Sequence, residues 1–302
     1  MIANMTIDIR DKTHISHRDV MWLSFIKKQD TYVFRKYYKQ GLRSQIIEIL
    51  DSADAIKQDK GEIINGIRFY PRARPLNILR IFRAQFESIE NVFEEIKKYK
   101  ILEDYLPPDA YSKSCEFVVD YIREGKRDFV LCGLQEYIEG KVLNPWDLFY
   151  KNHLINLVRS MQDQGHNPLK MTTAQLIQKV KKQASKFIDS LKRMILEANY
   201  VPDLAGIGNL ILTACGDIKL VDINNISRVS LEPDIGLDDK DYPVCDKSIE
   251  AVSIMEQKLL GRAIDKTETI YKIFLDPERI KRVKVLEEKF HHSSRFGELY
   301  PK

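Results

Sequence analysis

The chain has 302 residues, enough for one large domain or two lobes, and its 44% hydrophobic and 30% charged content is that of an ordinary globular protein. The net charge of +4 is small for this length and gives no argument for binding nucleic acid. The first twelve residues lack the apolar core of a signal peptide, and no run of about 18 apolar residues occurs, so we expect a soluble, intracellular protein without a transmembrane segment. The four cysteines and six histidines show no metal-ligand spacing, which indicates reduced cysteines that serve mostly in packing.

Two β-rich runs near the N-terminus, Val20 to Ile26 and Thr31 to Tyr38, are separated by the polar turn 27–30. This pattern is typical of a β-hairpin. Strand alternation places Val33 and Arg35 on one face of the second strand. The turn between the two runs contains no glycine.

Five arginines follow with no acidic residue between them, interleaved with apolar and aromatic residues: Arg68, Arg72, Arg74, Arg80 and Arg83. Guanidinium groups bind phosphate oxygens bidentately, so the cluster suits an anionic partner, such as a phosphorylated molecule, an anionic membrane or a nucleic acid. No specific nucleic-acid motif accompanies it. The alternative is a solvated helix face whose cations pair with Glu87, Glu90 and Glu94.

The middle of the chain alternates helical and strand patterns. Apolar residues at helical spacing predict a helix over 78–99. Residues 114–122 and 129–134 then predict two paired strands, followed directly by the segment Gln135 to Gly140.

The clearest helix covers residues 172–197. Thr172 and Gln175 fit a capping box at its start, and its apolar residues form one stripe. Upstream, Asn144 and Pro145 predict the start of an earlier helix.

A second hairpin is predicted where two short apolar runs, Leu210 to Thr213 and Ile218 to Val221, flank a Gly-Asp turn. Because its strands are close in length, Asn209 and Asp222 at their far ends should lie within a few ångströms of each other. Asp203 precedes Asn209 on the same loop, and carboxylate and amide oxygens are ligands that Mg²⁺ accepts. The alternative is a surface hairpin whose polar side chains are ordinary turn residues.

The C-terminal part predicts two more helices. One covers residues 243–261 and is closed by Gly261, with Asp246 near its start. The other begins at Asp276-Pro277 and has an apolar stripe against a basic face: Ile280, Val283, Leu286 and Phe290.

The order of these elements, with Asp203, Asn209 and Asp222 in the loop and hairpin, resembles the protein-kinase-like superfamily. The basic strand from Tyr32 to Gly41 is most similar to that of bacterial lipopolysaccharide core sugar kinases. The resemblance implies an α+β, bilobal fold. A small antiparallel β-sheet lobe would cover residues 1–139, with an insertion at about 42–80, and a mostly helical large lobe would cover 140–302.

The resemblance also implies that the cofactors are ATP and Mg²⁺ and that the acceptor is a hydroxyl of a small molecule or a lipopolysaccharide sugar. Asp203 would be the catalytic base, and Asn209 and Asp222 would hold the metal. Nucleotide contacts would come from four residues, Val33 over the adenine, Arg35 on the phosphates, and the backbone of Glu136 and Ile138. Asp246 would brace the catalytic loop or act only as a helix cap. The glutamate that pairs with Arg35 stays open between Glu87 and Glu90.

The chain departs from the family pattern at several motifs. Val201-Pro202 precede Asp203, Asp222-Ile223-Asn224 replaces the usual Asp-Phe-Gly, and no Ala-Pro-Glu motif follows. The first two departures and the absence of glycine from the turn at 27–30 favour the alternative of a pseudokinase, a binding or scaffold protein without turnover. The missing Ala-Pro-Glu motif argues against the peptide-substrate platform of ordinary protein kinases. We expect a cytoplasmic protein, with peripheral attachment at the inner membrane as the other possibility.

Overall fold

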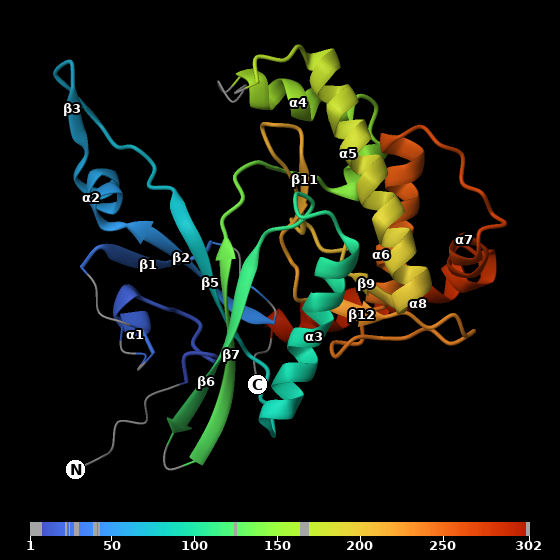
Figure 1. Cartoon of the computed structure of the whole chain (residues 1–302), viewed down its shortest axis with the longest axis horizontal. Coiled ribbons are helices and arrows are strands. Elements are labelled where there is room, and N and C mark those ends of the chain that lie inside the picture. The colour runs from blue at the N-terminus through green and yellow to red at the C-terminus, as the bar shows by residue number, and fades with distance from the viewer. Residues whose placement is uncertain are drawn as a thin grey trace. The chain divides into compact units, whose positions relative to one another are not determined.

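A computed structural model of the chain describes residues 8–21, 23, 25–26, 30–38, 41, 43–123, 126–163 and 169–299. The chain divides into two compact units (Figure 1). Residues 1–96 and 113–137 form the first, and residues 97–112 and 138–302 form the second. A separate antiparallel sheet and a mostly helical part give the chain an α+β fold. In the described ranges, no helix combines the length and the apolar character that a membrane span requires.

The first unit is built on a five-stranded antiparallel sheet with the strand order β1-β2-β5-β7-β6. In this order the strands are β1 (Tyr32–Lys36), β2 (Ser44–Asp51), β5 (Pro75–Phe82), β7 (Lys126–Glu136) and β6 (Ser114–Arg123). The pairing of β6 with β7 confirms the predicted strands in the middle of the chain. Phe34, Ile47 and Ile81 contribute to the core under one face of this sheet.

The prediction of a hairpin at the N-terminus is wrong. Strand β1 pairs with β2, and Val33 lies opposite Leu50. Val20 lies in the short helix α1 (His17–Met21), and positions 22, 24 and 27–29 lie outside the described residues. Ser16 and Asp19 cap this helix reciprocally, since the Ser16 N–H donates to Asp19 Oδ2 at 2.7 Å and the Asp19 N–H donates to Ser16 Oγ at 3.4 Å. Val20 is buried, so its apolar character reflects core packing of a helix rather than a strand.

The prediction of a helix over 78–99 is also wrong for the first residues of that range. Residues up to Phe82 belong to strand β5, and helix α3 (Ile89–Tyr105) begins only after Ser88. All residues from Ile78 to Phe82 are buried, because other residues pack on both faces of this central strand: Leu79 and Ile81 lie in one core cluster, and Phe82 lies in another with Val92 of α3. A short run that is buried on both faces has no alternation, and its apolar spacing cannot be distinguished from that of a buried helix.

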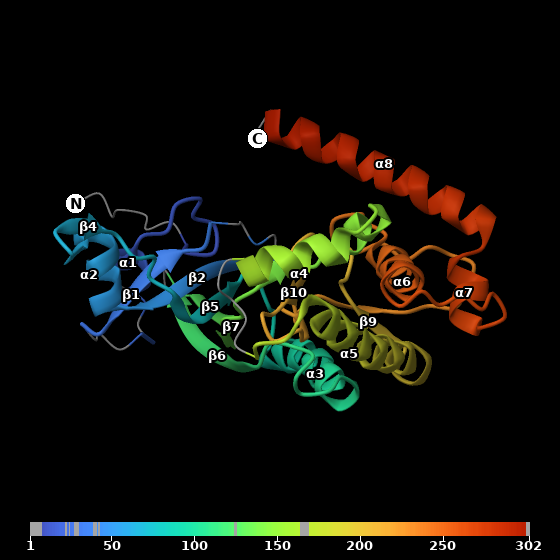
Figure 2. The same cartoon turned by 90° about the horizontal axis from the view of Figure 1, so that it is seen from above.

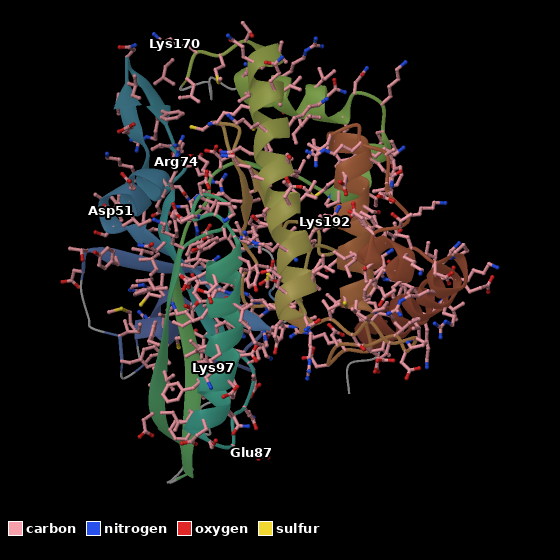
Figure 3. All side chains as sticks on the ribbon, turned by 45° about the vertical axis from the view of Figure 1, so that its right-hand side comes forward. Asp51, Arg74, Glu87, Lys97, Lys170 and Lys192 are labelled. Carbon is pink, nitrogen blue, oxygen red and sulfur yellow. The ribbon has the colours of Figure 1, made fainter. Side chains whose placement is uncertain are left out.

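The insertion expected at 42–80 is shorter than predicted, since β2 and β5 are integral strands of the sheet. The segment between them holds helix α2 (Ser52–Lys60) and a hairpin of β3 (Glu62–Ile64) and β4 (Ile67–Phe69). Asp51, labelled in Figure 3, starts α2 by accepting a hydrogen bond from the Ala53 N–H at 2.8 Å.

The second unit is mostly helical (Figure 2). Its helices include α4 (His153–Asp163), α5 (Thr173–Arg193), α6 (Val244–Ile254), α7 (Thr269–Phe274) and α8 (Pro277–Leu299). The capping box of Thr172 and Gln175 is confirmed, and the apolar stripe of α5 is buried at Val180, Phe187 and Leu191.

Two small sheets accompany these helices. One joins β8 (Lys141–Val142), β10 (Leu210–Leu212) and β11 (Ile218–Leu220), and the other joins β9 (Tyr200–Pro202) and β12 (Ile226–Arg228). The β10–β11 pair confirms the second predicted hairpin.

The predicted C-terminal helices are confirmed. A π-helical turn, Met255–Leu259, extends α6, and Gly261 follows with a φ of +73°. Asp276 caps α8, because its Oδ1 accepts hydrogen bonds from the N–H groups of Glu278 and Arg279, each at 3.0 Å. Of the expected α8 stripe, Val283 is buried, whereas Ile280 is exposed.

Candidate active site

The candidate site is organised by Asp203, which follows strand β9 directly. Because β9 pairs with β12, Pro202 lies opposite Ile226 and Asp203 comes beside Asn225. The Asp203 N–H donates to the Asn225 carbonyl oxygen at 2.8 Å. The Asn225 Nδ2 in turn donates to Asp203 Oδ2 at 2.8 Å. The strand pair therefore fixes both the main chain and the side chain of Asp203.

The other carboxylate oxygen of Asp203 holds the loop that follows. Oδ1 accepts hydrogen bonds from the N–H groups of Ala205 at 2.9 Å and Gly206 at 3.2 Å. Burial raises the pKa of this carboxyl, and the negative charge of Asp222 raises the pKa further. Asp203 and Asp222 are therefore close enough to interact electrostatically.

Asn209 is held against the same loop. Its Nδ2 donates to the Asp203 carbonyl oxygen at 2.9 Å, so Oδ1 is the atom that this side chain could offer to a cation. The close fit requires glycine at position 206, where a Cβ would lie 2.6 Å from the Asn209 Nδ2. Gly208 has a φ of +99°, which turns the chain into β10.

The β10–β11 hairpin brings Asp222 next to Asn209, as the sequence predicted. Leu210 lies opposite Leu220, and the Val221 N–H donates to the Asn209 carbonyl oxygen at 2.8 Å. Asp222 is the next residue. The two predicted metal ligands thus flank one hydrogen bond at the open end of the hairpin.

The donor set of the site suits a hard cation. It comprises carboxylates of Asp203 and Asp222 and amides of Asn209 and Asn225. Asn225 is only 8% exposed, and its Oδ1 is buried without a hydrogen-bond partner in the described part of the chain. Among the described residues, no group of three or more His, Cys, Asp or Glu could hold a metal ion by itself. Mg²⁺ usually takes one or two carboxylates together with substrate phosphates, so these residues fit a magnesium nucleotide better than an all-protein metal site.

Two contacts from outside the loop hold it in place. The Leu204 N–H donates to Ser248 Oγ on α6 at 3.0 Å, and Trp146 Nε1 donates to the Ala205 carbonyl oxygen at 3.2 Å. The Lys247 ammonium lies 4.5 Å from the centre of the Trp146 ring. Sequence patterns did not identify these residues, because Ser248 lies inside an apolar helix and nothing in its spacing signals the contact.

A tyrosine also faces this region. Tyr242 donates a hydrogen bond to Glu287 at 3.2 Å, and Glu287 forms an ion pair of 3.0 Å with Lys247. Burial, the neighbouring Glu287 and also the charge of Asp203 raise the pKa of Tyr242. The phenol therefore stays protonated at neutral pH.

Asp246 does not cap α6, since Pro243 occupies the N-cap position. The Asp246 carboxylate instead forms a buried, bidentate ion pair with Arg279, at 2.6 Å and 3.1 Å. Arg279 also donates to the carbonyl oxygens of Glu232 and Asp234, at 2.9 Å and 3.4 Å. Ser248 and Trp146 contact the loop, whereas Asp246 and Arg279 secure the segment that follows β12.

The remaining predicted nucleotide contacts fall in both units. Val33 and Arg35 lie on the edge strand β1, and Arg35 Nε donates to Glu48 Oε2 of β2 at 2.5 Å. Glu48, rather than Glu87 or Glu90, is therefore the partner of Arg35. Glu136 ends β7 and its N–H donates to the Lys113 carbonyl oxygen at 2.8 Å, whereas Ile138 belongs to the second unit.

The predicted arginine cluster is divided between two environments. Arg80 is buried in β5, where its Nε donates to Ser44 Oγ at 3.2 Å, and Arg83 donates to the Arg10 carbonyl oxygen at 2.5 Å. Arg68, Arg72 and Arg74 are exposed. The helix-face alternative is wrong, because these residues lie in strands and extended segments.

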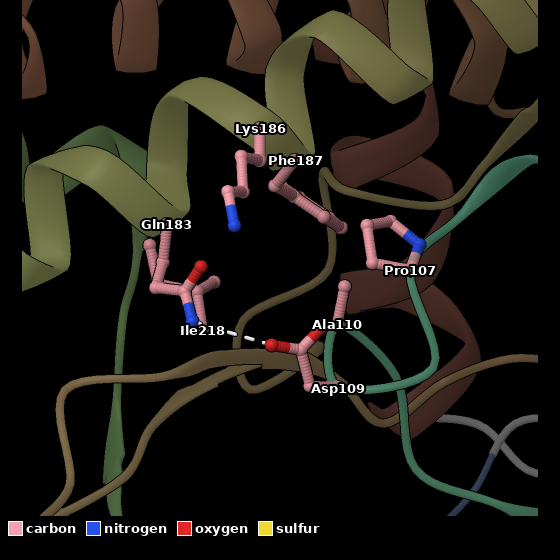
Figure 4. A pocket seen from close by; sticks show the side chains of 7 residues that line it. All are labelled: Pro107, Asp109, Ala110, Gln183, Lys186, Phe187 and Ile218. Atoms are coloured by element: carbon pink, nitrogen blue, oxygen red, sulfur yellow. Dashed lines mark hydrogen bonds between the residues drawn. The ribbon is translucent and has the colours of Figure 1, made fainter.

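A small pocket of the second unit lies apart from the predicted residues (Figure 4). It is lined by Pro107, Asp109, Ala110, Gln183, Lys186, Phe187 and Ile218. Gln183 donates across it to Asp109 at 3.3 Å and to Asp217 at 3.2 Å. The side-chain amide is thus already used within the protein.

Comparison of the sequence with models of protein families and with curated proteins gives no match. Functional inference therefore depends on the side chains of the loop and hairpin.

Proposed function

We propose that the protein is an ATP- and Mg²⁺-dependent phosphotransferase with a bilobal, kinase-like fold, acting on a hydroxyl of a small molecule or a lipopolysaccharide sugar. The supporting observation is the convergence of Asp203, Asn209 and Asp222 at the open end of one hairpin. A carboxylate beside a carboxylate and amide pair is the combination that phosphoryl transfer to an alcohol needs.

Asp203 orients the acceptor hydroxyl and accepts its proton. The raised pKa makes this carboxylate a stronger base than an ordinary surface aspartate. Oδ1 is occupied by two backbone N–H groups, so the hydroxyl meets the second lone pair of Oδ2, beside the bond from Asn225.

Asn209 and Asp222 would hold the metal, and the buried Oδ1 of Asn225 is a further oxygen that could face it. A bound nucleotide would supply the phosphoryl group, and its Mg²⁺ would offset the negative charge of the phosphates. Nucleotide binding is assigned to Val33, Arg35, Glu136 and Ile138. The ion pair with Glu48 keeps the Arg35 guanidinium on a fixed side of β1.

A pseudokinase is the second candidate, and one observation favours it. Both carboxylate oxygens of Asp203 already accept hydrogen bonds, Oδ1 from N–H groups of the loop and Oδ2 from Asn225, which is what a purely structural aspartate would do. In this case the protein binds a nucleotide or a partner without turnover.

Thermal unfolding with and without ATP and Mg²⁺ tests the proposal. A ligand at a hundred times its Kd stabilises the folded state by about 2.7 kcal/mol. We expect a magnesium-dependent rise in Tm that Asp222→Ala abolishes and that the control Asp59→Ala, at an exposed position of α2, retains. The absence of any shift at millimolar nucleotide would rule out the phosphotransferase and would leave only a pseudokinase that binds a partner.

Turnover distinguishes the two candidates. In an enzyme, Asp203→Asn should abolish phosphate transfer while the nucleotide-dependent rise in Tm persists. A wild-type protein that shows the rise in Tm but transfers no phosphate to any acceptor would be a pseudokinase.

A further inference from the structure

The β3–β4 hairpin stands out from the five-stranded sheet of the first unit (Figure 1). Every residue from Ile63 to Tyr70 is exposed. At its tip, Ile63, Ile64 and Ile67 have exposed fractions of 61%, 48% and 72%. Exposed isoleucines concentrated in this way are uncommon on a protein surface without a binding role.

The apolar residues of the tip lie on both faces of the hairpin. Ile64 lies opposite Ile67, so these two share one face, and Ile63 lies opposite Arg68 on the other. Phe69 and Tyr70 add exposed aromatic rings, again one to each face. A globular partner docked on one face would leave the apolar residues of the other face in water.

Basic residues surround the base of the hairpin. Residues 57–74 contain five basic and two acidic side chains, with no charge between Ile63 and Ile67. Lys60, Arg68 and Arg72 are exposed, and Figure 3 shows Arg74 beyond the hairpin, near the start of β5. The hairpin therefore has an uncharged apolar tip and a positively charged base.

The hairpin is held in a fixed shape before any partner binds. Asn65 and Gly66 have φ angles of +51° and +79°, the two positive values that a tight two-residue hairpin turn needs. The Arg68 guanidinium donates to the Lys60 carbonyl oxygen at 2.7 Å, which ties β4 to the end of α2. A Cβ at position 61 would lie 2.8 Å from the Arg68 Cγ, so this junction is closely packed.

We propose that this hairpin docks the protein on an anionic lipid bilayer, with the isoleucine tip in the acyl region and the basic base at the phosphates. A bilayer surrounds an inserted tip on every side, which matches apolar residues on both faces. Aromatic rings favour the interface between the two layers, where Phe69 and Tyr70 would lie. Basic residues near an anionic surface each add to the attraction. The inference is independent of the proposed phosphotransferase activity.

Sedimentation with lipid vesicles tests it on the chain of 302 residues. The probes are vesicles of phosphatidylcholine alone and vesicles in which about one-third is phosphatidylglycerol. We expect binding to the anionic vesicles only, weakening as salt is raised. The double substitution Ile64→Ser with Ile67→Ser should weaken binding at least about tenfold. The reason is that serine side chains do not gain the free energy that isoleucine side chains gain on transfer from water into the acyl region. Arg68→Glu with Arg72→Glu should weaken it at least about fivefold for each positive charge removed.

Matched controls come from the second unit. Val285 is 63% exposed on α8 and Lys272 is exposed on α7, so Val285→Ser and Lys272→Glu should bind vesicles as the wild type does. Unchanged thermal midpoints would show that the variants are folded.

Either of two results would overturn the proposal. One is a wild-type protein that does not bind anionic vesicles, and the other is a tip variant that binds them as well as the wild type does. If the wild type ignores vesicles and the tip substitutions instead dissociate a homodimer in sedimentation velocity, the hairpin contacts a second copy of the chain.

Discussion

Asn225 and Asp203 hold each other by two hydrogen bonds, although they lie 22 residues apart in the sequence. The Asp203 N–H donates to the Asn225 carbonyl oxygen, and the Asn225 Nδ2 donates to Asp203 Oδ2, each at 2.8 Å. The intervening segment includes the whole β10–β11 hairpin and Asp222. A change at Asn225 should therefore affect the geometry of the loop through Asp203.

Replacement of Asn225 by alanine tests this link. The partly buried Asp203 Oδ2 would lose its donor, which should lower the free energy of unfolding by about 1–3 kcal/mol. Urea unfolding followed by circular dichroism measures the loss. Asn156→Ala, at an exposed position of α4, is the matched control and should stay within about 0.5 kcal/mol of the wild type. Equal stabilities of the two variants would show that the bond to Asp203 contributes nothing.

The pH dependence of stability should report the buried carboxyl of Asp203. Its pKa is raised above the ordinary value of 3.8, first by burial and then by Asp222, so the folded state holds this proton more tightly than the unfolded chain does. The folded state therefore loses stability as the pH rises from 3.8 through the raised pKa. Asp203→Asn removes this titration.

The variant should thus gain stability relative to the wild type as the pH rises from 3.8 through the raised pKa of Asp203. A constant offset is also expected, because the new amide faces the Asn225 Nδ2. Urea unfolding of both proteins across this range measures the difference. A stability difference that does not change with pH would show that Asp203 titrates normally in the folded state.

Glycine at position 206 should be required for the position of Asn209. The added methyl group of Gly206→Ala would meet the Asn209 Nδ2 at 2.6 Å and displace that side chain. We expect a loss of about 1–3 kcal/mol of stability, the usual cost of overpacking, together with loss of the magnesium-dependent rise in Tm. Gly236→Ala is the control, because a Cβ there meets nothing within 4 Å. A Gly206→Ala variant that keeps the full rise in Tm would show that glycine at position 206 is not required for the position of Asn209.

The buried ion pair of Asp246 and Arg279 should stabilise the second unit. Arg279→Met leaves a carboxylate whose side chain is 2% exposed without its cation, which should cost about 3–5 kcal/mol. A second substitution, Asp246→Asn, should restore part of that loss. Guanidinium chloride unfolding of the single and double variants gives the coupling energy. Arg282→Met, one turn along α8 and exposed, should cost less than about 1 kcal/mol.

Sequence patterns predicted the parts of the fold that depend on neighbouring residues. The capping box of Thr172 and Gln175 and the β10–β11 hairpin are set within a few positions of the chain, and both are confirmed. Residues 78–82 of strand β5 were predicted as helix, because both of their faces are covered by residues distant in the sequence, which no local pattern reveals.

The same division applies to the candidate site. Asn209 and Asp222 could be placed together from the length of the hairpin alone. The bond from Leu204 to Ser248 joins residues 44 positions apart, and it depends on how α6 packs beside the loop. The bond from Asn225 to Asp203 depends on the pairing of β9 with β12, which was not predicted from the sequence.

Residues 97–112 belong to the second unit, although the residues on either side of them belong to the first. Tyr99, Leu102 and Leu106 from this stretch are buried in the core that contains Phe187 and Leu191 of α5. A fragment that ends near residue 137 would therefore expose three large apolar side chains to water, and the complementary fragment would contain a core with three gaps. Neither fragment contains a complete hydrophobic core. Splitting the chain at one linker should therefore give two aggregation-prone fragments instead of two folded domains.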